Sequence, residues 1–461
     1  TLSYARNLAT DGHWGLIPTE PANSATSPLN VLLLGGAAAL FRLSGGVQPI
    51  WGLCMVFVGL AVVMAWCWSR IVATLSLPPA VPALGVAIVL VNPFVLSAVG
   101  LEVLLIPTVL IGLLAAAVRG RPGVFGVVSG LALLARADLV VFVVPLALAS
   151  AGVRGRLPRA MGAATAVALP WDAWSWWHFG SAIPDTFVIK TLQRSFGDWT
   201  FANGPGLYYG RDALATVVTF APVVAGVVVL LGWTVLRVTR PGIARPELLP
   251  AAALVAAGAG YYGVYALLGV PPYQWYYVPT FAATAIGFSV LIGAVPRGRV
   301  QRRAVGAPGM AFLACLVVAS LVSDVRGGVP WRVPVIFGNW ATPADYARVG
   351  REVGRNVGPA TVIAPPEIGT LAYFCGCSMV DAFADRGRVV PLIEERIRHA
   401  GPVARAVLRA NYLLLDRDQQ PRPATYQLIW EPGPATRSDQ WQTWSPAAGV
   451  AHLQLVELPQ R

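Results

Sequence analysis

The chain has 461 residues, of which 56% are hydrophobic and only 12% are charged. Soluble domains carry roughly 25% charged residues, so a chain this long and this apolar cannot cover its surface with polar groups, which excludes an ordinary soluble protein. The net charge of +12 does not require a nucleic-acid partner, because much of it lies in short basic clusters between apolar stretches. Such clusters mark the cytoplasmic ends of membrane helices.

About eleven apolar stretches are candidates for membrane-spanning helices, each of which needs about 20 mostly apolar residues. They lie near 28–44, 50–69, 80–96, 102–118, 123–135, 139–153, 160–177, 213–236, 248–268, 276–295 and 308–323. If successive loops alternate between the two sides of the membrane, the early loops and the later loops assign the turn at 97–101 to opposite sides. Either one early stretch does not span the membrane, or the region 80–99 is broken at Asn92-Pro93. We predict a polytopic α-helical membrane protein.

Four basic loops between these stretches orient the chain, since Lys and Arg favour the cytoplasmic side. They lie at 119–121, 154–159, 237–245 and 297–303. The remaining loops then face outward. We therefore expect a multi-pass protein of the plasma membrane, with the lipid bilayer around it and three segments: a first extracytoplasmic loop at 1–27, a transmembrane domain at 28–324 and an extracytoplasmic α/β domain at 325–461.

The last segment has the composition of a soluble domain and reads as a small α/β unit. Thr342 followed by proline predicts the capped start of a helix over 342–357. A second helix is expected at 391–409, with short strands at 361–364, 379–382 and 412–415, and this alternation suggests parallel pairing. Cys375 and Cys377 form a CxC whose spacing alone does not indicate a zinc site, and a redox role is the minor alternative.

The predicted outer loops hold most of the polar residues that could carry chemistry. Glu102 follows a helix end, Arg136 and Asp138 flank a helix break, and Asp185 and Lys190 share the stretch IPDTFVIKTLQR. Ionisable residues near membrane depth are costly and often mark function. Positive groups beside a carboxylate suit a phosphate-bearing substrate, because the cation holds the phosphate while the carboxylate acts as a base.

Each of these residues also has a structural interpretation. Asp138 could simply pair with Arg136, Glu102 could cap the next helix, and Lys190 could be a solvated loop charge. Aromatic side chains favour the membrane–water interface, so an interfacial belt is favoured over a sugar platform for two stretches, 171–177 and 273–277. The sequence has no Walker A loop, which excludes a nucleotide-driven pump in this chain. It has no HExxH motif either.

Several short stretches, in order along most of the chain, resemble the C-type glycosyltransferases (GT-C). The resemblance is to the actinobacterial cell-envelope branch, which includes mycobacterial arabinofuranosyltransferases. LSYARNLATDGHWGLIPTEPANSATSPLNVLLL (2–34) is similar to the first outer loop of the family. Later stretches resemble its SGLET-type turn, its TRPE/D turn, its YGxxLPNTxYAK stretch and its soluble domain: VGLEVLLI (99–106), LLARADLVVF (133–142), FGSAIPDTFVIKT (179–191) and APPEIGTLAYFCGCSMVDAFADRG (364–387).

The resemblance implies a GT-C-like fold and a membrane enzyme. It would transfer a sugar, with arabinofuranose as the best guess, from a polyprenyl-phosphate donor to a cell-envelope glycan on the outer face. Transfer would proceed with inversion and a carboxylate general base. Cationic side chains or a divalent metal would stabilise the leaving lipid phosphate, while no other cofactor and no nucleic-acid partner are expected.

The resemblance also implies roles for individual residues. Glu102 and Asp185 would be catalytic, while the main acidic pair of the family would lie upstream of Thr1. The residues that would bind the donor phosphate are Arg6, Arg136, His178 and Lys190. Those that would bind the acceptor are Trp275, Tyr276, Glu367 and Asp381. For the last two, a structural role is favoured. The chain departs from the family pattern in three places: Asp185 where relatives often have Asn, Ala137 in place of Pro, and Asn30 in place of Trp.

Two other functions remain as alternatives. A transporter or flippase of polyprenyl-linked lipids would predict charged residues at mid-membrane on several helices and an internal repeat, and the sequence shows neither. A non-catalytic protein of envelope assembly would predict loss of the acidic pair.

Overall fold

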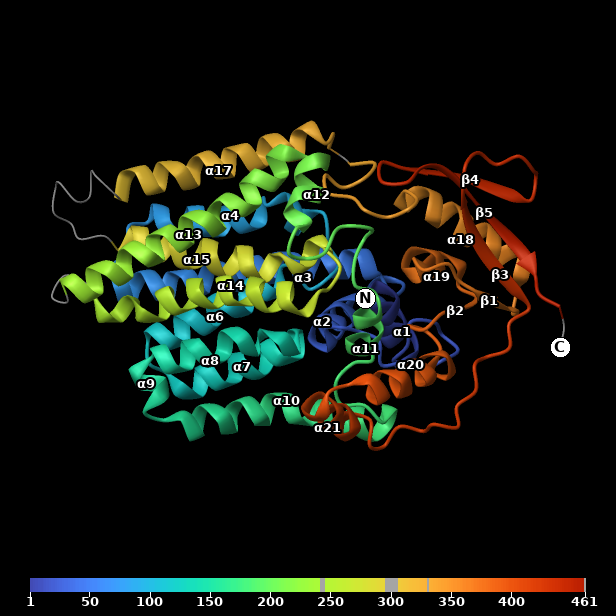
Figure 1. The fold of residues 1–461 in the computed structure, drawn as a ribbon, viewed down its shortest axis with the longest axis horizontal. Helices are drawn as coiled ribbons and strands as arrows, with labels where there is room; N and C mark the ends of the chain where they lie inside the picture. The colour runs from blue at the N-terminus through green and yellow to red at the C-terminus, as the bar shows by residue number, and fades with distance from the viewer. Residues whose placement is uncertain (241–244, 295–305, 330, 460–461) are drawn as a thin grey trace. The chain divides into compact units, whose positions relative to one another are not determined.

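The computed structural model describes residues 1–240, 245–294, 306–329 and 331–459 and is mostly helical (Figure 1). The chain divides into two compact units. Unit 1 comprises Thr1–Val56, Trp171–Gln193 and Phe337–Arg461, and unit 2 comprises Phe57–Pro170 and Arg194–Ile336. Two helices, α3 (Pro49–Leu75) and α10 (Leu157–Phe179), have residues in both units.

Unit 2 is built from apolar helices. The predicted apolar stretches are largely helical, with non-helical residues that include those at 91–92, 102–104 and 150. The longer elements are α4 (Ala80–Leu90), α6 (Leu105–Val118), α7 (Pro122–Ala135), α8 (Val140–Ala149), α13 (Ala213–Thr239), α14 (Leu249–Leu268), α15 (Val278–Gly293) and α17 (Ala307–Arg326). Short elements lie between them: α5 (Pro93–Leu96), η2 (Ala137–Leu139), α9 (Ala151–Arg154), α12 (Gly204–Arg211), η3 (Pro246–Leu248) and η4 (Gln274–Tyr276).

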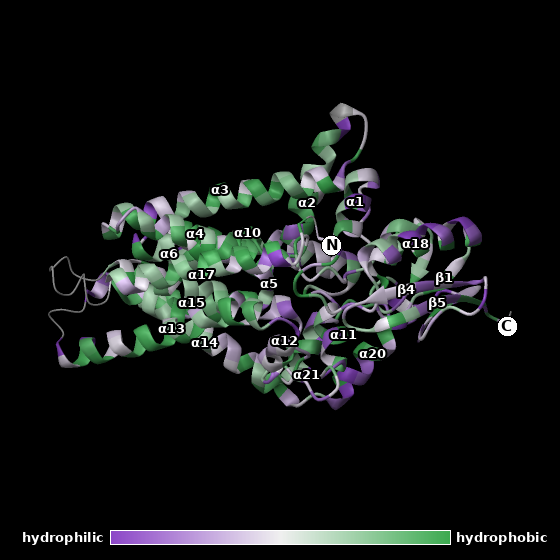
Figure 2. Cartoon of the chain, turned by 90° about the horizontal axis from the view of Figure 1, so that it is seen from above, coloured by the Kyte–Doolittle hydropathy of each residue, from purple (hydrophilic) through white to green (hydrophobic). Residues whose placement is uncertain are grey.

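Five helices in the described part of the chain are long and apolar enough to cross a membrane. They are Pro49–Leu75, Ala213–Thr239, Pro246–Leu268, Gln274–Gly293 and Ala307–Arg326. The shorter apolar helices include α4, α6 and α7, and the hydropathy colours of Figure 2 show how apolar the helices of this unit are. Of the predicted cytoplasmic loops, 297–303 lies outside the described residues and 237–245 lies partly outside them.

The break at Asn92-Pro93, one of the two alternatives that the sequence left open, is present in the structure. The Asn92 side chain accepts hydrogen bonds from the backbone amides of Phe94 and Val95, and Pro93 follows as the first residue of α5. An asparagine cap followed by proline is a strong helix start, so the apolar stretch 80–96 forms two short helices in place of one span. The Asn92 amide also donates to the Thr219 hydroxyl of α13 at 3.1 Å.

Small residues let the helices of unit 2 approach closely. A side chain on Gly85 of α4 would come within 2.3 Å of the Trp68 ring on α3, and one on Gly287 of α15 would come within 2.5 Å of Val255 on α14. Close backbone approach at small residues is the usual means by which membrane helices associate.

Unit 1 combines helices with a five-stranded sheet of order β2-β1-β3-β5-β4. Its helices are α1 (Leu2–Asp11), α2 (Pro28–Leu40), η1 (Phe41–Ser44), α11 (Thr186–Leu192), α18 (Pro343–Val357), α19 (Ile368–Cys375), α20 (Arg386–His399) and α21 (Pro402–Asn411). Its strands are β1 (Thr361–Ile363), β2 (Ser378–Val380), β3 (Tyr426–Pro432), β4 (Gln440–Ser445) and β5 (Gly449–Glu457).

The sheet confirms part of the predicted pairing. Strand β1 pairs parallel with β2 and with β3, with Thr361 opposite Ser378. Strand β5 runs antiparallel to β3 and β4, which the sequence did not suggest. Side chains of α18 and α19 cover the sheet and bury its core: Val349, Val353 and Leu371 pack with Val362, Leu428 and Leu453.

Two details of the predicted α/β domain are wrong. The expected strand at 412–415 is a turn after α21, in which Tyr412 is buried and Leu413 and Leu414 are exposed; so short an apolar run cannot be told from a helix end by its pattern. The expected single helix at 391–409 is two helices, because α20 ends at His399 and Pro402 starts α21, as proline does at a helix start.

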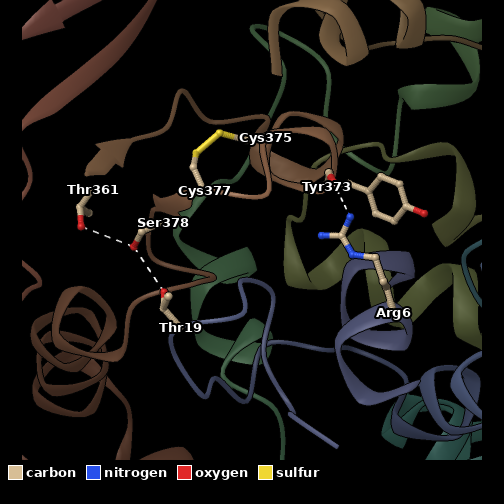
Figure 3. The surroundings of a disulfide bond; sticks show 7 residues. All are labelled: Arg6, Thr19, Thr361, Tyr373, Cys375, Cys377 and Ser378. Carbon is tan, nitrogen blue, oxygen red and sulfur yellow. Dashed lines mark hydrogen bonds between the residues drawn. A yellow bond between two sulfur atoms is a disulfide. The ribbon is translucent and has the colours of Figure 1, made fainter. Parts of the chain in front are cut away.

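Cys375 and Cys377 form a disulfide at the end of α19 (Figure 3). Gly376 between them has a φ of 62°, a left-handed conformation that glycine adopts without steric cost. In Figure 3 the Ser378 hydroxyl lies between those of Thr19 and Thr361, at 3.4 Å from each. The pair is thus a local crosslink next to the start of β2.

Candidate functional site

The polar residues of unit 2 gather around Arg136, and we call Glu102, Arg136, Asp138, Tyr261 and Tyr265 the Arg136 cluster. Arg136 ends α7 in an extended conformation, and η2 starts directly after it. Its guanidinium is only 4% exposed. Nε and Nη2 donate to the two carboxylate oxygens of Asp138 at 3.0 and 2.6 Å, a bidentate geometry that is among the strongest ion pairs.

The other donors of Arg136 are engaged as well. Nη1 donates to Glu102 at 3.3 Å, and Nη2 lies 3.2 and 2.7 Å from the hydroxyls of Tyr261 and Tyr265. Both tyrosine hydroxyls also donate to Asp138. Helix-to-helix hydrogen bonds of this kind hold α14 to the break between α7 and α8.

The formal charge of the Arg136 cluster is −1, from one guanidinium and two carboxylates. The ring of Tyr276 lies under the guanidinium at 5.2 Å, and Trp275 stacks on Tyr273 at 4.5 Å. The structure therefore brings three predicted site residues together: Glu102, Arg136 and Tyr276. Their net charge repels a phosphate, so the cluster is better suited to holding the helices than to binding a donor phosphate.

The polar residues of unit 1 include a second buried group, which we call the Asp185 cluster: Asn23, Ser181, Asp185, Arg386 and Tyr412. Asp185 precedes α11, and its backbone amide donates to the Asn23 carbonyl at 2.7 Å. Its side chain does not cap the helix. The residue is 2% exposed, and in the described part of the chain its Oδ1 has no hydrogen-bond partner.

Burial raises the pKa of Asp185 to about 6, against the opposing charge of Arg386 and the nearby hydroxyls of Ser181 and Tyr412. A carboxyl with a pKa near neutrality can accept a proton and release it again under physiological conditions. Arg386 is itself buried, and among the described residues its Nε and Nη2 have no hydrogen-bond partner. The Asp185 cluster therefore has donor and acceptor atoms without partners among the described residues, whereas the guanidinium donors of the Arg136 cluster are hydrogen-bonded.

Side chains of neighbouring segments hold the Asp185 cluster in place through hydrogen bonds and a cation–π contact. The Asn23 amide donates to the Ser175 hydroxyl at 3.0 Å and to the carbonyl and hydroxyl of Ser181 at 2.9 Å. The guanidinium of Arg386 lies over the ring of Phe179 at 5.8 Å. Segments from three distant parts of the sequence thus meet at one carboxylate.

Two predicted phosphate ligands lie on the segments that flank Asp185. Lys190 is on α11, five residues after Asp185, and its ammonium donates to the Thr26 hydroxyl at 3.1 Å. His178, in the last turn of α10, is exposed and stacks on Trp174 with ring centres 5.1 Å apart.

The remaining predicted residues of unit 1 have local partners. Arg6 donates to the Tyr373 carbonyl at 2.6 Å and lies over its ring, as Figure 3 shows. Glu367 accepts from the Trp340 amide and the Tyr346 hydroxyl, and burial raises its pKa. Asp381 accepts from two backbone amides that follow it, and burial raises its pKa to about 7. Both carboxylates therefore have hydrogen-bond partners within unit 1.

Sequence reasoning did not single out several members of the two clusters. Tyr261 and Tyr265 could have been found, because four-residue spacing puts them on one face of an apolar helix. Arg386 lies in the quoted stretch ADRG, but nothing in its local pattern connects it with Asp185. The structure alone links these two residues, which are 201 positions apart (386 − 185).

A divalent metal would need several ligands from these residues. The described part of the chain contains no group of three or more His, Cys, Asp or Glu side chains that could hold one, and Glu102 and Asp138 are both paired with Arg136. The described residues do not fit such an ion.

Comparison with solved structures gives a match over the whole chain. The crystal structure of ArnT from Cupriavidus metallidurans bound to undecaprenyl phosphate superposes with a TM-score of 0.57 and 13% sequence identity, covering 100% of this chain and 94% of ArnT. No family model matches the sequence, and no curated protein sequence matches it. The structural likeness shows that the chain shares the fold of ArnT, and the apolar helices and the C-terminal sheet confirm the predicted fold class: a polytopic α-helical membrane protein with a small C-terminal α/β domain.

Proposed function

We propose that this chain is a membrane glycosyltransferase that takes a sugar from a polyprenyl-phosphate donor. The observation that carries the proposal is the full-length likeness to ArnT, which was crystallised with undecaprenyl phosphate. The ordered sequence resemblance to GT-C enzymes supports it independently. A fold alone does not determine function, so the residues of the site must supply the rest of the argument.

Asp185 is the better general base of the two carboxylates with an expected catalytic role. Its pKa of about 6 and its unpartnered oxygen leave it able to accept a proton. Glu102 is held in an ion pair by Arg136, so its carboxylate is already engaged with a neighbouring side chain. We assign Glu102 to positioning Arg136.

The proposed step is an inverting displacement. Asp185 removes the proton from an acceptor hydroxyl, whose oxygen attacks the anomeric carbon of the donor sugar. The bond between that carbon and the phosphate oxygen breaks, and the polyprenyl phosphate leaves with the electron pair. A cation close to the phosphate stabilises the developing charge.

Lys190 is the proposed cation for the leaving phosphate. It lies on α11, five residues after Asp185, in the stretch that resembles the YGxxLPNTxYAK stretch of the family. His178 precedes the same loop and is exposed. We do not assign Arg136 to this role, because its charge is already balanced by two carboxylates.

The outer face of the plasma membrane is the proposed side of the reaction. The Cys375–Cys377 disulfide lies in the C-terminal domain, and disulfides persist mainly in oxidising compartments. This supports the extracytoplasmic side expected from the basic loops. The acceptor is proposed to be a cell-envelope glycan, with Trp275 and Tyr276 as the aromatic residues that contact it.

The sugar is proposed to be arabinofuranose, on the sequence resemblance alone. The test uses the full-length protein in membranes, radiolabelled decaprenyl-phospho-arabinose and an arabinan oligosaccharide acceptor. Transfer that is lost in Asp185→Asn and reduced in Lys190→Ala, but kept in the exposed control Asp416→Asn, is the expected result.

Other outcomes separate the alternatives. Transfer only from mannose, glucose or galactose polyprenyl phosphates would overturn the arabinose assignment and keep the enzyme class. No transfer from any donor by a folded protein would contradict the enzyme. Movement of fluorescent polyprenyl lipid across vesicles would then favour a flippase, and its absence would favour an assembly protein.

A further inference from the structure

A cavity of about 270 Å³ lies on unit 1. Helix α20, helix α21 and the turn that follows α21 line it. Its walls are Glu394, Ile397, Arg398, Arg405, Arg409 and Arg417. Four guanidinium groups around one carboxylate give the cavity a formal charge of +3.

Two of these guanidiniums contact other groups of the protein. Arg417 pairs with Glu394 at 2.7 Å, and Arg405 donates to the carbonyls of Arg398 and Ala400 at the end of α20. The guanidiniums of Arg398 and Arg409 have no hydrogen bond, ion pair or ring contact within the described residues, and both residues are exposed. Two guanidiniums are therefore available to an anion from outside.

The same segment exposes a row of apolar side chains. Val403 and Val407 lie one turn apart on α21, and the chain continues into two leucines. Their exposed fractions are high: Val403 79%, Val407 55%, Leu413 63% and Leu414 45%. Leu408, on the opposite face of α21, is buried. Arginines beside exposed apolar residues on one helix are typical of a helix that lies in the membrane interface.

Contacts within unit 1 connect this segment to the end of α10. The Asn411 side chain bonds both the amide and the carbonyl of Ile183, at 2.8 and 3.3 Å. The backbone at Gly180 packs so closely on Leu414 that a side chain there would meet the Leu414 carbonyl at 2.5 Å. Trp177, three residues earlier, is 82% exposed, and exposed tryptophans mark the membrane–water boundary.

We propose that the arginine-lined cavity binds the phosphate group of an anionic membrane lipid while the apolar residues of α21 rest in the bilayer interface. The two free guanidiniums match the charge and the oxygen geometry of a phosphodiester. The exposed valines and leucines match the acyl region next to that phosphate, which a soluble phosphate compound would not provide. The proposal concerns a lipid contact separate from the sugar-transfer site.

The test measures amide hydrogen exchange of Pro402–Asn411 in the full chain, reconstituted in nanodiscs. Discs of phosphatidylcholine alone are compared with discs that also contain phosphatidylglycerol. The anionic lipid is expected to slow exchange of this helix. Each arginine near an anionic surface strengthens membrane binding by about fivefold. The double variant Arg398→Gln, Arg409→Gln should therefore lower the exchange protection given by the anionic lipid by about thirtyfold.

Matched controls separate this site from general charge. Arg355→Gln removes an exposed arginine of α18 and should leave the lipid effect unchanged. Val403→Ser with Val407→Ser keeps the arginines and should weaken the effect. Exchange of Pro343–Val357 reports whether a variant is folded; if the double arginine variant unfolds there, the two single variants carry the test.

Three results would overturn the proposal. The first is equal exchange of the wild type in both kinds of disc. The second is full lipid protection of folded arginine variants. The third is equal protection by inorganic phosphate in phosphatidylcholine discs, which would assign the cavity to a free anion in place of a lipid.

Discussion

The Arg136 cluster of unit 2 and the Asp185 cluster of unit 1 contain the same kinds of group but differ in whether their polar atoms have hydrogen-bond partners. Each has a buried arginine, a carboxylate and tyrosine. Around Arg136, the guanidinium and the hydroxyls are matched to acceptors at hydrogen-bonding distance. Around Asp185, atoms of the carboxylate, the arginine and the tyrosine lack partners among the described residues.

The difference suggests a division of roles. A buried polar network whose members are satisfied stabilises one arrangement of the helices. A buried polar group left without a partner costs folding free energy, and such groups are found where a substrate or a proton completes the set. We therefore attribute helix positioning to the Arg136 cluster and proton transfer to the Asp185 cluster.

The largest expected effect is on sugar transfer. Asp185→Asn keeps the shape of the side chain but removes the base, and loss of a general base typically lowers the rate by about 10²–10⁴-fold. The turnover of the purified variant with saturating donor measures this. Glu102→Gln should retain more activity per folded molecule than Asp185→Asn, and the reverse order would break the division of roles.

The next effect is on stability. Arg136→Gln leaves the buried Glu102 and the partly buried Asp138 without their counter-charge, which should cost about 3–5 kcal/mol. Arg245→Gln is the matched control, because it removes an arginine from an exposed pair with Glu247 at 3.8 Å and should cost at most about 1 kcal/mol. Thermal unfolding in detergent, followed as loss of folded monomer, compares the two; equal losses would contradict a stabilising Arg136 cluster.

A smaller effect is expected from pH. The pKa of Asp185 is raised to about 6 in the folded chain, so the folded state binds a proton more tightly than the unfolded state does. Unfolding free energy should therefore fall as pH rises from about 4 to about 6, by on the order of 2–3 kcal/mol. Asp185→Asn should reduce this decrease in unfolding free energy. If the variant kept the wild-type pH dependence, the pKa of the Asp185 carboxyl would not be raised in the folded chain.

The smallest effect is expected from the disulfide. The loop closed by Cys375 and Cys377 is very short, so reducing it should cost at most about 1–2 kcal/mol. In a Cys54→Ala, Cys67→Ala, Cys315→Ala background, a thiol reagent that cannot cross membranes should label intact cells only after reduction. Labelling that requires lysis would place the C-terminal domain in the cytoplasm.

The fold was largely predictable from local sequence signals. Apolar stretches of sufficient length predicted the helices, Asn92-Pro93 predicted their break, and Thr342 predicted a cap that accepts from the Asp345 amide at 3.1 Å. These features depend on residues that are neighbours in the chain. The second half of the sheet was missed, since strands such as Gln440–Ser445 are short and polar and owe their pairing to tertiary contacts.

The candidate site was predictable only in part. The sequence identified Asp185 and Glu102 as unusual carboxylates, but not which one is paired. Which carboxylate is paired depends on the positions of Arg136, Arg386 and Tyr412. These residues are distant in the sequence from the carboxylates they approach. Local patterns do not encode such distances, because packing of the whole fold brings these side chains together.

The most direct test of the account is the pH dependence of sugar transfer, measured as kcat/KM for the wild type, Asp185→Asn and the control Asp381→Asn. The account predicts that wild-type kcat/KM rises with pH through about 6, as the pKa of Asp185 requires. The rise should persist in Asp381→Asn and disappear from the residual activity of Asp185→Asn. An unchanged profile in Asp185→Asn would contradict the assignment of proton transfer to the Asp185 cluster.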